Sequence, residues 1–125
     1  MFEIVTELTE KRIRDNWATT PIDVDGVEFR PKVGTAFIRP HVEWVDTEAA
    51  ITRDRGTGYL MVEIYTPINQ GSRPALALAD SMAQLFDRWV SGDLTYFVSR
   101  AIRVGQREEW YQVNVLIPFK YDRCH

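Results

Sequence analysis

The stretch "GYLMVEIYTPINQGSRPALALADSMAQLF", residues 58–86, contains a strand pattern, a polar joint and a helix pattern in succession. Residues 59–66 alternate in side-chain direction, which predicts a β-strand with Leu60, Val62 and Ile64 on one face. Large side chains also fill the opposite face. We therefore expect this strand to be central in a sheet or covered on both sides.

The second half of the stretch predicts a helix over residues 74–90. Pro74 suits the first turn of a helix, where no N–H is required, and Gly92 marks the end. The apolar residues recur at spacings of three and four, so they share one face of the helix: Leu78, Met82, Leu85, Phe86 and Trp89.

The joint "TPINQGSRPA", residues 66–75, has the outline of a phosphate-binding turn, because it contains a glycine and lies between a strand and a helix. It lacks the lysine and the glycine spacing of a P-loop, and it lacks the glycine pattern of dinucleotide-binding sites. Ser72 directly precedes the helix, which favours an N-cap over a nucleophile. We interpret the joint as a hinge in which Pro67 and Gly71 turn the chain.

The N-terminal part of the chain predicts one more helix. Residues 2–17 are amphipathic, with Ile4, Val5 and Leu8 on a shared face. The segment "IDVDGVEF", residues 22–29, is consistent with a hairpin or with a single turn at its Asp-Gly pair.

Three further strands are predicted. "TAFIRPHVEWV" (35–45) contains Pro40, which has no N–H and therefore favours an edge or bulged strand. "DTEAAITRDRGTG" (46–58) is either a long connection or a hairpin with a mobile tip. "LTYFVSRAIRV" (94–104) and "EWYQVNVLIPFKY" (109–121) form the last two strands, with a turn at the Gly-Gln pair between them.

These elements predict a single α+β domain over residues 1–125, in the order helix, strand, strand, helix, strand, strand. We expect a roughly four-stranded, mostly antiparallel or mixed sheet with both helices on one face, because each helix has one apolar side. The other face would carry a set of large residues typical of a partner surface: Tyr59, Met61, Tyr65, Tyr96, Trp110 and Phe119.

Composition excludes several classes of protein. The net charge of −3 argues against a free-standing nucleic-acid binder, and the single cysteine excludes an internal disulfide. The charged N-terminal residues contain no apolar signal core or membrane span, so we expect a soluble intracellular protein.

The sequence offers no catalytic or metal constellation. A serine triad would require Ser72, His41 and an acid such as Asp80 to converge, and nothing in their spacing favours this. Cys124 and His125 are better read as a frayed tail than as zinc ligands. We therefore predict no enzymatic activity, no cofactor and no metal.

The charged residues that bracket the strand at 59–66 are Arg53, Asp54, Arg55 and Arg73. They are either solvated loop charges or groups that pair with a neighbouring subunit or partner, for which arginine is well suited.

The layout of the chain resembles the phage tail terminator family. The resemblance is carried by the N-terminal helix and by four blocks of sequence: "TPIDVDGVEFRP" leading into "AFIRPHV", "RGTGYLMVEIYTPINQG", "ALALADSMAQLF" and "WYQVNVLIPFKY". The block with an arginine and a glycine before an alternating strand, followed by Thr66, Pro67 and Gly71 and an alanine-rich helix, is the most specific.

The resemblance implies a non-enzymatic virion protein of the tail and neck, made in the host cytoplasm. Such proteins assemble as hexameric rings, stack on the last ring of the major tail tube protein, stop its polymerisation and face a neck or head-completion protein. DNA passes through the lumen as transient cargo, and no membrane is involved. The residues expected at subunit or tube contacts are Arg53, Asp54, Arg55, Arg73, Tyr59, Met61, Tyr65 and Trp110.

The alternative functions are that of another neck or stopper protein and that of a small α+β ligand-binding or enzymatic domain.

Overall fold

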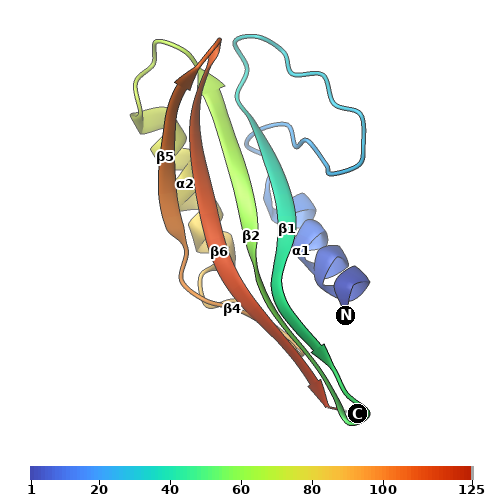
Figure 1. Cartoon of the computed structure of the whole chain (residues 1–125). Coiled ribbons are helices and arrows are strands. Elements are labelled where there is room, and N and C mark those ends of the chain that lie inside the picture. The colour runs from blue at the N-terminus through green and yellow to red at the C-terminus, as the bar shows by residue number, and fades with distance from the viewer. Residues whose placement is uncertain (125) are drawn as a thin grey trace.

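The computed structural model describes residues 1–124, and His125 lies outside the described residues. This part of the chain is an α+β fold of two helices and a six-stranded antiparallel sheet (Figure 1). The elements are α1 (Phe2–Asn16), β1 (Phe37–Ala49), β2 (Arg53–Pro67), α2 (Arg73–Phe86), β3 (Val90–Ser91), β4 (Leu94–Tyr96), β5 (Arg100–Arg107) and β6 (Trp110–Cys124). The fold class is confirmed, whereas the expected four strands are six.

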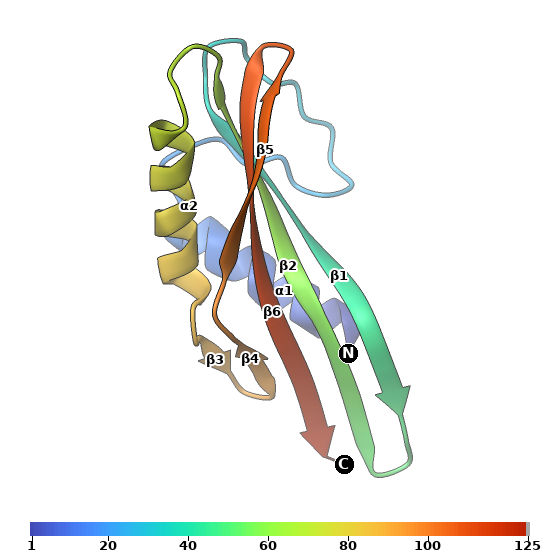
Figure 2. The ribbon, with the colours of Figure 1, turned by 60° about the vertical axis from the view of Figure 1, so that its left-hand side comes forward.

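Three long strands form the centre of the sheet, in the order β1, β2, β6, and β4 and β5 both pair with β6. The predicted strand at 59–66 is the middle of β2 and is central, as expected. Both helices lie on one face of the sheet, as Figures 1 and 2 show. The opposite face has no helix over it, so it is called the open face below.

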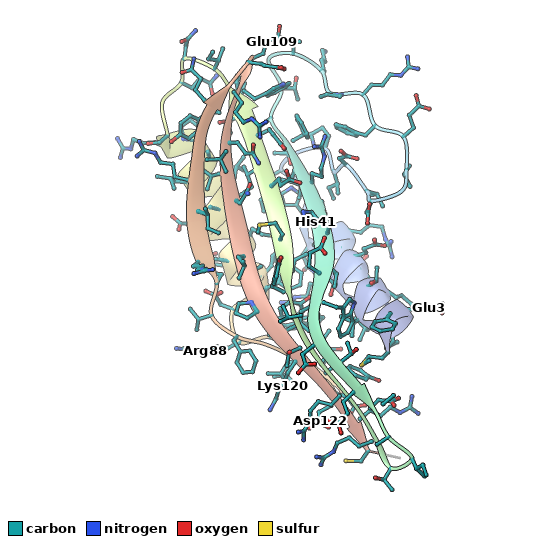
Figure 3. The ribbon with its side chains drawn as sticks, viewed as in Figure 1. Glu3, His41, Arg88, Glu109, Lys120 and Asp122 are labelled. Atoms are coloured by element: carbon teal, nitrogen blue, oxygen red, sulfur yellow. The ribbon has the colours of Figure 1, made fainter. Side chains whose placement is uncertain are left out.

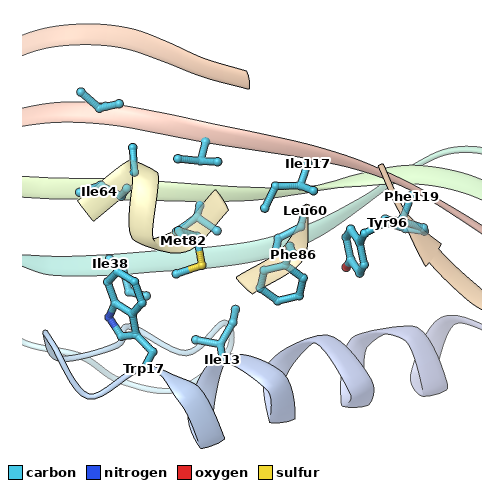
Figure 4. Packing of buried hydrophobic residues seen from close by; sticks show 14 of the residues in the cluster. Ile13, Trp17, Ile38, Leu60, Ile64, Met82, Phe86, Tyr96, Ile117 and Phe119 are labelled. Carbon is cyan, nitrogen blue, oxygen red and sulfur yellow. The ribbon is translucent and has the colours of Figure 1, made fainter. Parts of the chain in front are cut away.

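The hydrophobic core lies between the helices and the sheet (Figure 4). The predicted face of β2 is buried, and its residues pair with buried residues of β6, for example Val62 with Val115. Helix α2 contributes Met82 and Phe86, both fully buried. Helix α1 is also linked to the sheet by a buried hydrogen bond between Thr9 Oγ1 and the Tyr96 hydroxyl of β4, at 2.6 Å.

The predicted strand at 94–104 is divided into β4 and β5. Both parts pair with β6 along one line, from Leu94 opposite Tyr121 to Arg107 opposite Trp110. The division falls opposite Pro118, which has no N–H to donate, although its carbonyl oxygen accepts from Phe97 N. Pro118 therefore interrupts the hydrogen-bond ladder between β6 and residues 94–107, although the sequence pattern of residues 94–104 predicts one continuous strand.

Two predicted boundaries were wrong in this half of the chain. Helix α2 ends at Phe86 rather than at residue 90, so Trp89 packs on the core from a turn and not from the helix. The last hairpin turns at Glu108 and Glu109, not at the Gly-Gln pair. Glu108 has a positive φ of 53°, and Gly105 (φ 98°) instead lies at a bulge in β5.

Helix α1 begins and ends where its amphipathic pattern predicts. Its buried residues are Val5, Thr9 and Ile13, whereas Ile4 is 39% exposed, so the buried face is rotated from the predicted one. Of the two interpretations of residues 22–29, the turn is present and the hairpin is not. Ile22 instead makes an isolated bridge to Ile38 at the outer edge of β1.

The sheet continues beyond the body of the molecule as an arm, defined here as residues 45–57 and 120–124. The ends of β1, β2 and β6 form it. Lys120 and Tyr121 at its base still pair with β4, and Figure 2 shows the strand ends beyond them extending past α1 and the β3–β4 hairpin. Of the two interpretations of residues 46–58, the hairpin is present. Cys124 pairs with Arg53, so the predicted frayed tail is strand at Cys124, and the prediction for His125 lies outside the described residues.

Candidate interaction surfaces

The arm holds Arg53 and Arg55 against a carboxylate of the same chain. Arg53 Nε lies 3.3 Å from Asp122 Oδ1, and Arg55 Nη2 lies 3.3 Å from Asp122 Oδ2. These contacts follow from the register, which sets Arg55 opposite Asp122 on neighbouring strands. The two arginines are therefore partly satisfied within the subunit. About half of each side chain remains exposed and available to a second carboxylate.

The arm joins the body where two glycines pass beneath aromatic rings. A Cβ at Gly56 would meet the ring of Trp44, and a Cβ at Gly58 would meet the Glu43 carbonyl oxygen and Phe119. A bulge between Trp44 and Asp46 lies opposite these glycines and changes the pairing register of β1. Gly56 and Gly58 are therefore required because a larger side chain would not fit there, and not because they make a loop flexible.

The open face carries an aromatic cluster near the end of the sheet opposite the arm. Phe37 of β1 stacks on Tyr65 of β2, with ring centroids 4.7 Å apart. Trp110 of β6 meets Phe37 edge-on at 5.0 Å, and Phe29 reaches the same ring at 5.2 Å from the segment before β1. Tyr65 and Trp110 were predicted for this surface, and the structure brings them together.

A polar network continues from this cluster towards the middle of the open face. The Tyr65 hydroxyl donates to Glu63 Oε1 at 2.9 Å, and Gln112 Nε2 donates to the same oxygen at 3.3 Å. His41 Nε2 lies 3.4 Å from Glu63 Oε2 (Figure 3 labels His41). Partial burial and the hydrogen bond to Glu63 raise the pKa of Tyr65 to about 12. Arg39 connects the network to Asp23.

The expected composition of the open face needs one correction. Tyr96 and Phe119 belong to the core, at 0% and 1% exposure. Phe119 pairs with Tyr96 and with Gly58, and these positions face the helices. Tyr59 and Met61 do lie on the open face and are partly buried there.

Arg73 is not part of the arm. It is exposed at the first residue of α2, which follows the end of β2, whereas Arg53 and Arg55 are at the start of β2. Figure 2 shows these two ends of β2 at opposite ends of the molecule. Ser72 is at the N-cap position as predicted, but its side chain makes no capping hydrogen bond.

Sequence reasoning missed Phe37 and Arg39 as members of this surface, whereas the alternation of residues 59–66 places Glu63 on the same face as Tyr65. The signal was present in the alternation of β1, because Ile38 and Val42 define one face and the residues between them must define the other. The alternation does not show which strand pairs with β1, so it could not predict that Phe37 contacts Tyr65.

Comparisons with known proteins give a family match over most of the chain and a similar fold. The model of a family described as phage tail terminator protein matches residues 4–119. A solved structure with 19% sequence identity superposes with a TM-score of 0.72, covering 97% of this chain and 95% of that one. At this identity the likeness shows the fold alone. The chain matches none of the curated proteins.

Proposed function

Because this chain belongs to the phage tail terminator protein family, we propose that it assembles as a hexameric ring on the end of the tail tube and terminates tube polymerisation. Membership of this family gives the chain a structural role in the phage tail. A structural role favours a protein without enzymatic activity. No helix in the described part of the chain is long and apolar enough to span a membrane.

The observation that supports a ring is the presence of different surfaces on one subunit. A closed ring is built from head-to-tail contacts, so each subunit needs two unlike surfaces for its neighbours and a third for the tube. The arm projects from one end of the sheet, and the aromatic cluster of Phe37, Tyr65 and Trp110 lies near the other end on the open face. These two surfaces differ in charge, shape and apolar content.

In this proposal the arm makes subunit contacts and the open face contacts the tube or the neck. The half-exposed Arg53 and Arg55 and the neighbouring Asp54 are suited to pairing with charged groups of an adjacent copy. Tyr59, Met61, Tyr65 and Trp110 supply the partly exposed large side chains that protein interfaces favour. Arg73, at the far end, would meet a different partner from the arm.

The partners proposed are the major tail tube protein on one side and a neck or head-completion protein on the other. DNA would be transient cargo through the lumen. The net charge of −3 fits a conduit that does not retain DNA, because tight non-specific binding requires many cationic contacts to phosphate.

The test is the length of tail tubes. Purified tube protein polymerised without this chain should give tubes of unlimited length, and addition of the chain should arrest growth with one ring at the tube end. A neck or stopper protein, the alternative, would leave tube length unchanged and bind only after termination. Electron microscopy of tube lengths at several ratios of the two proteins distinguishes the two outcomes.

A further inference from the structure

Strand β5 (Arg100–Arg107) forms an edge of the sheet in the described chain, and α2 lies against part of it. It pairs with β6 on one side and has no strand on the other. Its apolar residues are exposed, with Ile102 at 36% and Val104 at 41%, and Val98 just before it is at 55%. Soluble proteins usually protect such an edge, because an uncovered strand pairs readily with other chains. The β5 edge therefore has the character of an interface.

The charges of this edge are all positive. Arg100, Arg103 and Arg107 are exposed, and within residues 1–124 none of their side chains forms an ion pair or a hydrogen bond. Arg88 lies on the same side of the molecule, as Figure 3 shows. Exposed apolar residues interleaved with arginine are the composition that interface cores favour.

The opposite side of the molecule carries a matching set of negative charges. Glu3, Glu7 and Glu10 follow one another at spacings of four and three on α1, so they lie on one face of the helix. They line a shallow groove with Phe2, Thr6 and Arg14. None of the three forms an ion pair in the described chain, not even with Lys11 or Arg14, the residues one turn away.

We propose that the β5 edge of one copy docks on the glutamate face of α1 of the next copy. This inference rests on the proposed ring, and it adds to the arm a second contact between neighbouring subunits. Figure 3 labels Glu3 and Arg88 at opposite edges of the molecule, so the two surfaces are separate and unlike, as a head-to-tail contact requires.

Charge selects a second copy as the partner. Arg100 and Arg103 pair with Leu116 and Val113 of β6, so they lie on opposite faces of β5 and make both faces of this edge positive. The glutamate face of α1 carries the complementary charge. A symmetric contact of β5 with β5 would instead oppose arginine with arginine. A nucleic acid would satisfy the arginines but leave the glutamate face unexplained.

The other edge of the sheet is less suited to receive β5. The outer side of β1 is occupied at Ile38 by the bridge from Ile22, and it is interrupted by Pro40, which has no N–H. Helix α1 is therefore the surface on that side that presents complementary groups.

Two charge-reversed chains test the contact. The first carries Arg100→Glu and Arg103→Glu, and the second carries Glu3→Lys and Glu7→Lys. Alone, each should self-associate at least ten-fold more weakly than the wild type, in sedimentation velocity with and without tail tubes. Mixed in equal amounts they should recover assembly, because every contact in an alternating ring again joins opposite charges.

A third chain with Arg30→Glu and Lys32→Glu is the matched control, since it has the same charge change in the segment before β1. It should assemble normally, and it should not rescue the Glu3→Lys, Glu7→Lys chain. Circular dichroism shows whether each chain is folded. If a reversed chain does not fold, the milder pairs Arg100→Gln, Arg103→Gln and Glu3→Gln, Glu7→Gln replace it and should weaken assembly in the same direction.

The outcomes separate this inference from the proposed function. Normal assembly of both reversed chains, with tube growth still arrested, overturns the inference and leaves the proposed function standing. Loss of tube binding without loss of self-association by the Arg100→Glu, Arg103→Glu chain also overturns it, because β5 would then contact the tube. If the wild type neither self-associates nor limits tube length, both fail together.

Discussion

The three long strands of this protein pass through two regions that are held together differently. In the body, β1, β2 and β6 pair residues such as Ile38, Ile64 and Val113, all fully buried beneath the helices. In the arm the same strands pair Glu48 with Arg55 and Arg55 with Asp122, and most side chains are exposed.

The comparison indicates that the body supplies most of the stability of the fold, whereas the arm supplies side chains that other proteins can contact. Buried apolar area supplies most of the free energy of folding, and exposed ion pairs supply little. The ladder between β2 and β6 continues without a break from the body into the arm, so the body can hold the arm in place although only Tyr121 at the arm's base belongs to the core. The arm's surface residues are then available for contacts with other chains. For example, the apolar side chains of Val45 and Ile51 in the arm are 71% and 97% exposed.

The largest effect on the body is expected from Phe86→Ala. Phe86 is fully buried, with its ring centroid 4.9 Å from that of Tyr96 and 5.7 Å from that of Trp89. Loss of its ring should lower the free energy of unfolding by about 3–5 kcal/mol, because a cavity remains. Urea unfolding measures this. The exposed neighbour Gln84→Ala is the control, and equal effects of the two variants would contradict the position of the core.

The junction of the two regions is tested by Gly58→Ala. The added Cβ meets the Glu43 carbonyl and Phe119, and a backbone atom cannot move away as a flexible side chain can. We expect a loss of about 1–3 kcal/mol, as overpacking of a well-packed site usually costs. Gly26→Ala, where a Cβ has open space, separates the effect of packing from that of backbone strain, since its φ is positive. A neutral Gly58→Ala would show that the junction is loosely packed.

The link between α1 and the sheet is tested by Thr9→Val. This change leaves the buried Tyr96 hydroxyl without its partner at 2.6 Å, which should cost about 1–3 kcal/mol. Combining it with Tyr96→Phe should cost less than the sum of the two single changes, because no unpaired polar atom remains. Additive losses in urea unfolding would mean that the two groups do not interact.

A smaller effect is expected on the open face from Tyr65→Phe. It removes the hydrogen bond to Glu63 and should cost about 1 kcal/mol at neutral pH. Because the folded state raises the pKa of Tyr65 to about 12, the stability linked to the protonated hydroxyl is complete below pH 10 and is lost as the pH rises towards 12. The variant should therefore lose less stability than the wild type between pH 10 and pH 12. Tyr96 is present in both proteins, so a parallel decline would contradict the assignment to Tyr65.

The smallest effect on stability is expected in the arm, from Arg53→Glu combined with Arg55→Glu. Both side chains are about half exposed and form ion pairs only with Asp122 among the described residues, so the loss of stability should be smaller than in the four variants above. Assembly should nevertheless be weakened, because like charges would meet the carboxylates of a neighbour. Sedimentation with and without tail tubes measures this. Normal rings from the folded double variant would show that the arm makes no subunit contact.

Local pattern predicted the elements whose burial follows their own periodicity. The core face of β2 at Leu60, Val62 and Ile64 and the extent of α1 were both predicted correctly. Predictions were wrong where a distant residue decides the outcome. Pro118 of β6 interrupts the ladder of β4 and β5, and the packing of Trp89 on Tyr96 and Phe86 accompanies an earlier end of α2.

The candidate surfaces divide in the same way. The sequence by itself determined the alternating apolar residues of the strands, the one apolar face of each helix, and the arginines beside glycines in a chain of net charge −3. Only the tertiary structure decided that Phe119 and Tyr96 are core, that Arg53 and Arg55 share Asp122, and that Arg73 lies at the far end of β2. The physical reason is that a strand's periodicity assigns its side chains to two faces, whereas strand pairing and helix docking decide which face is covered and which residues meet across it.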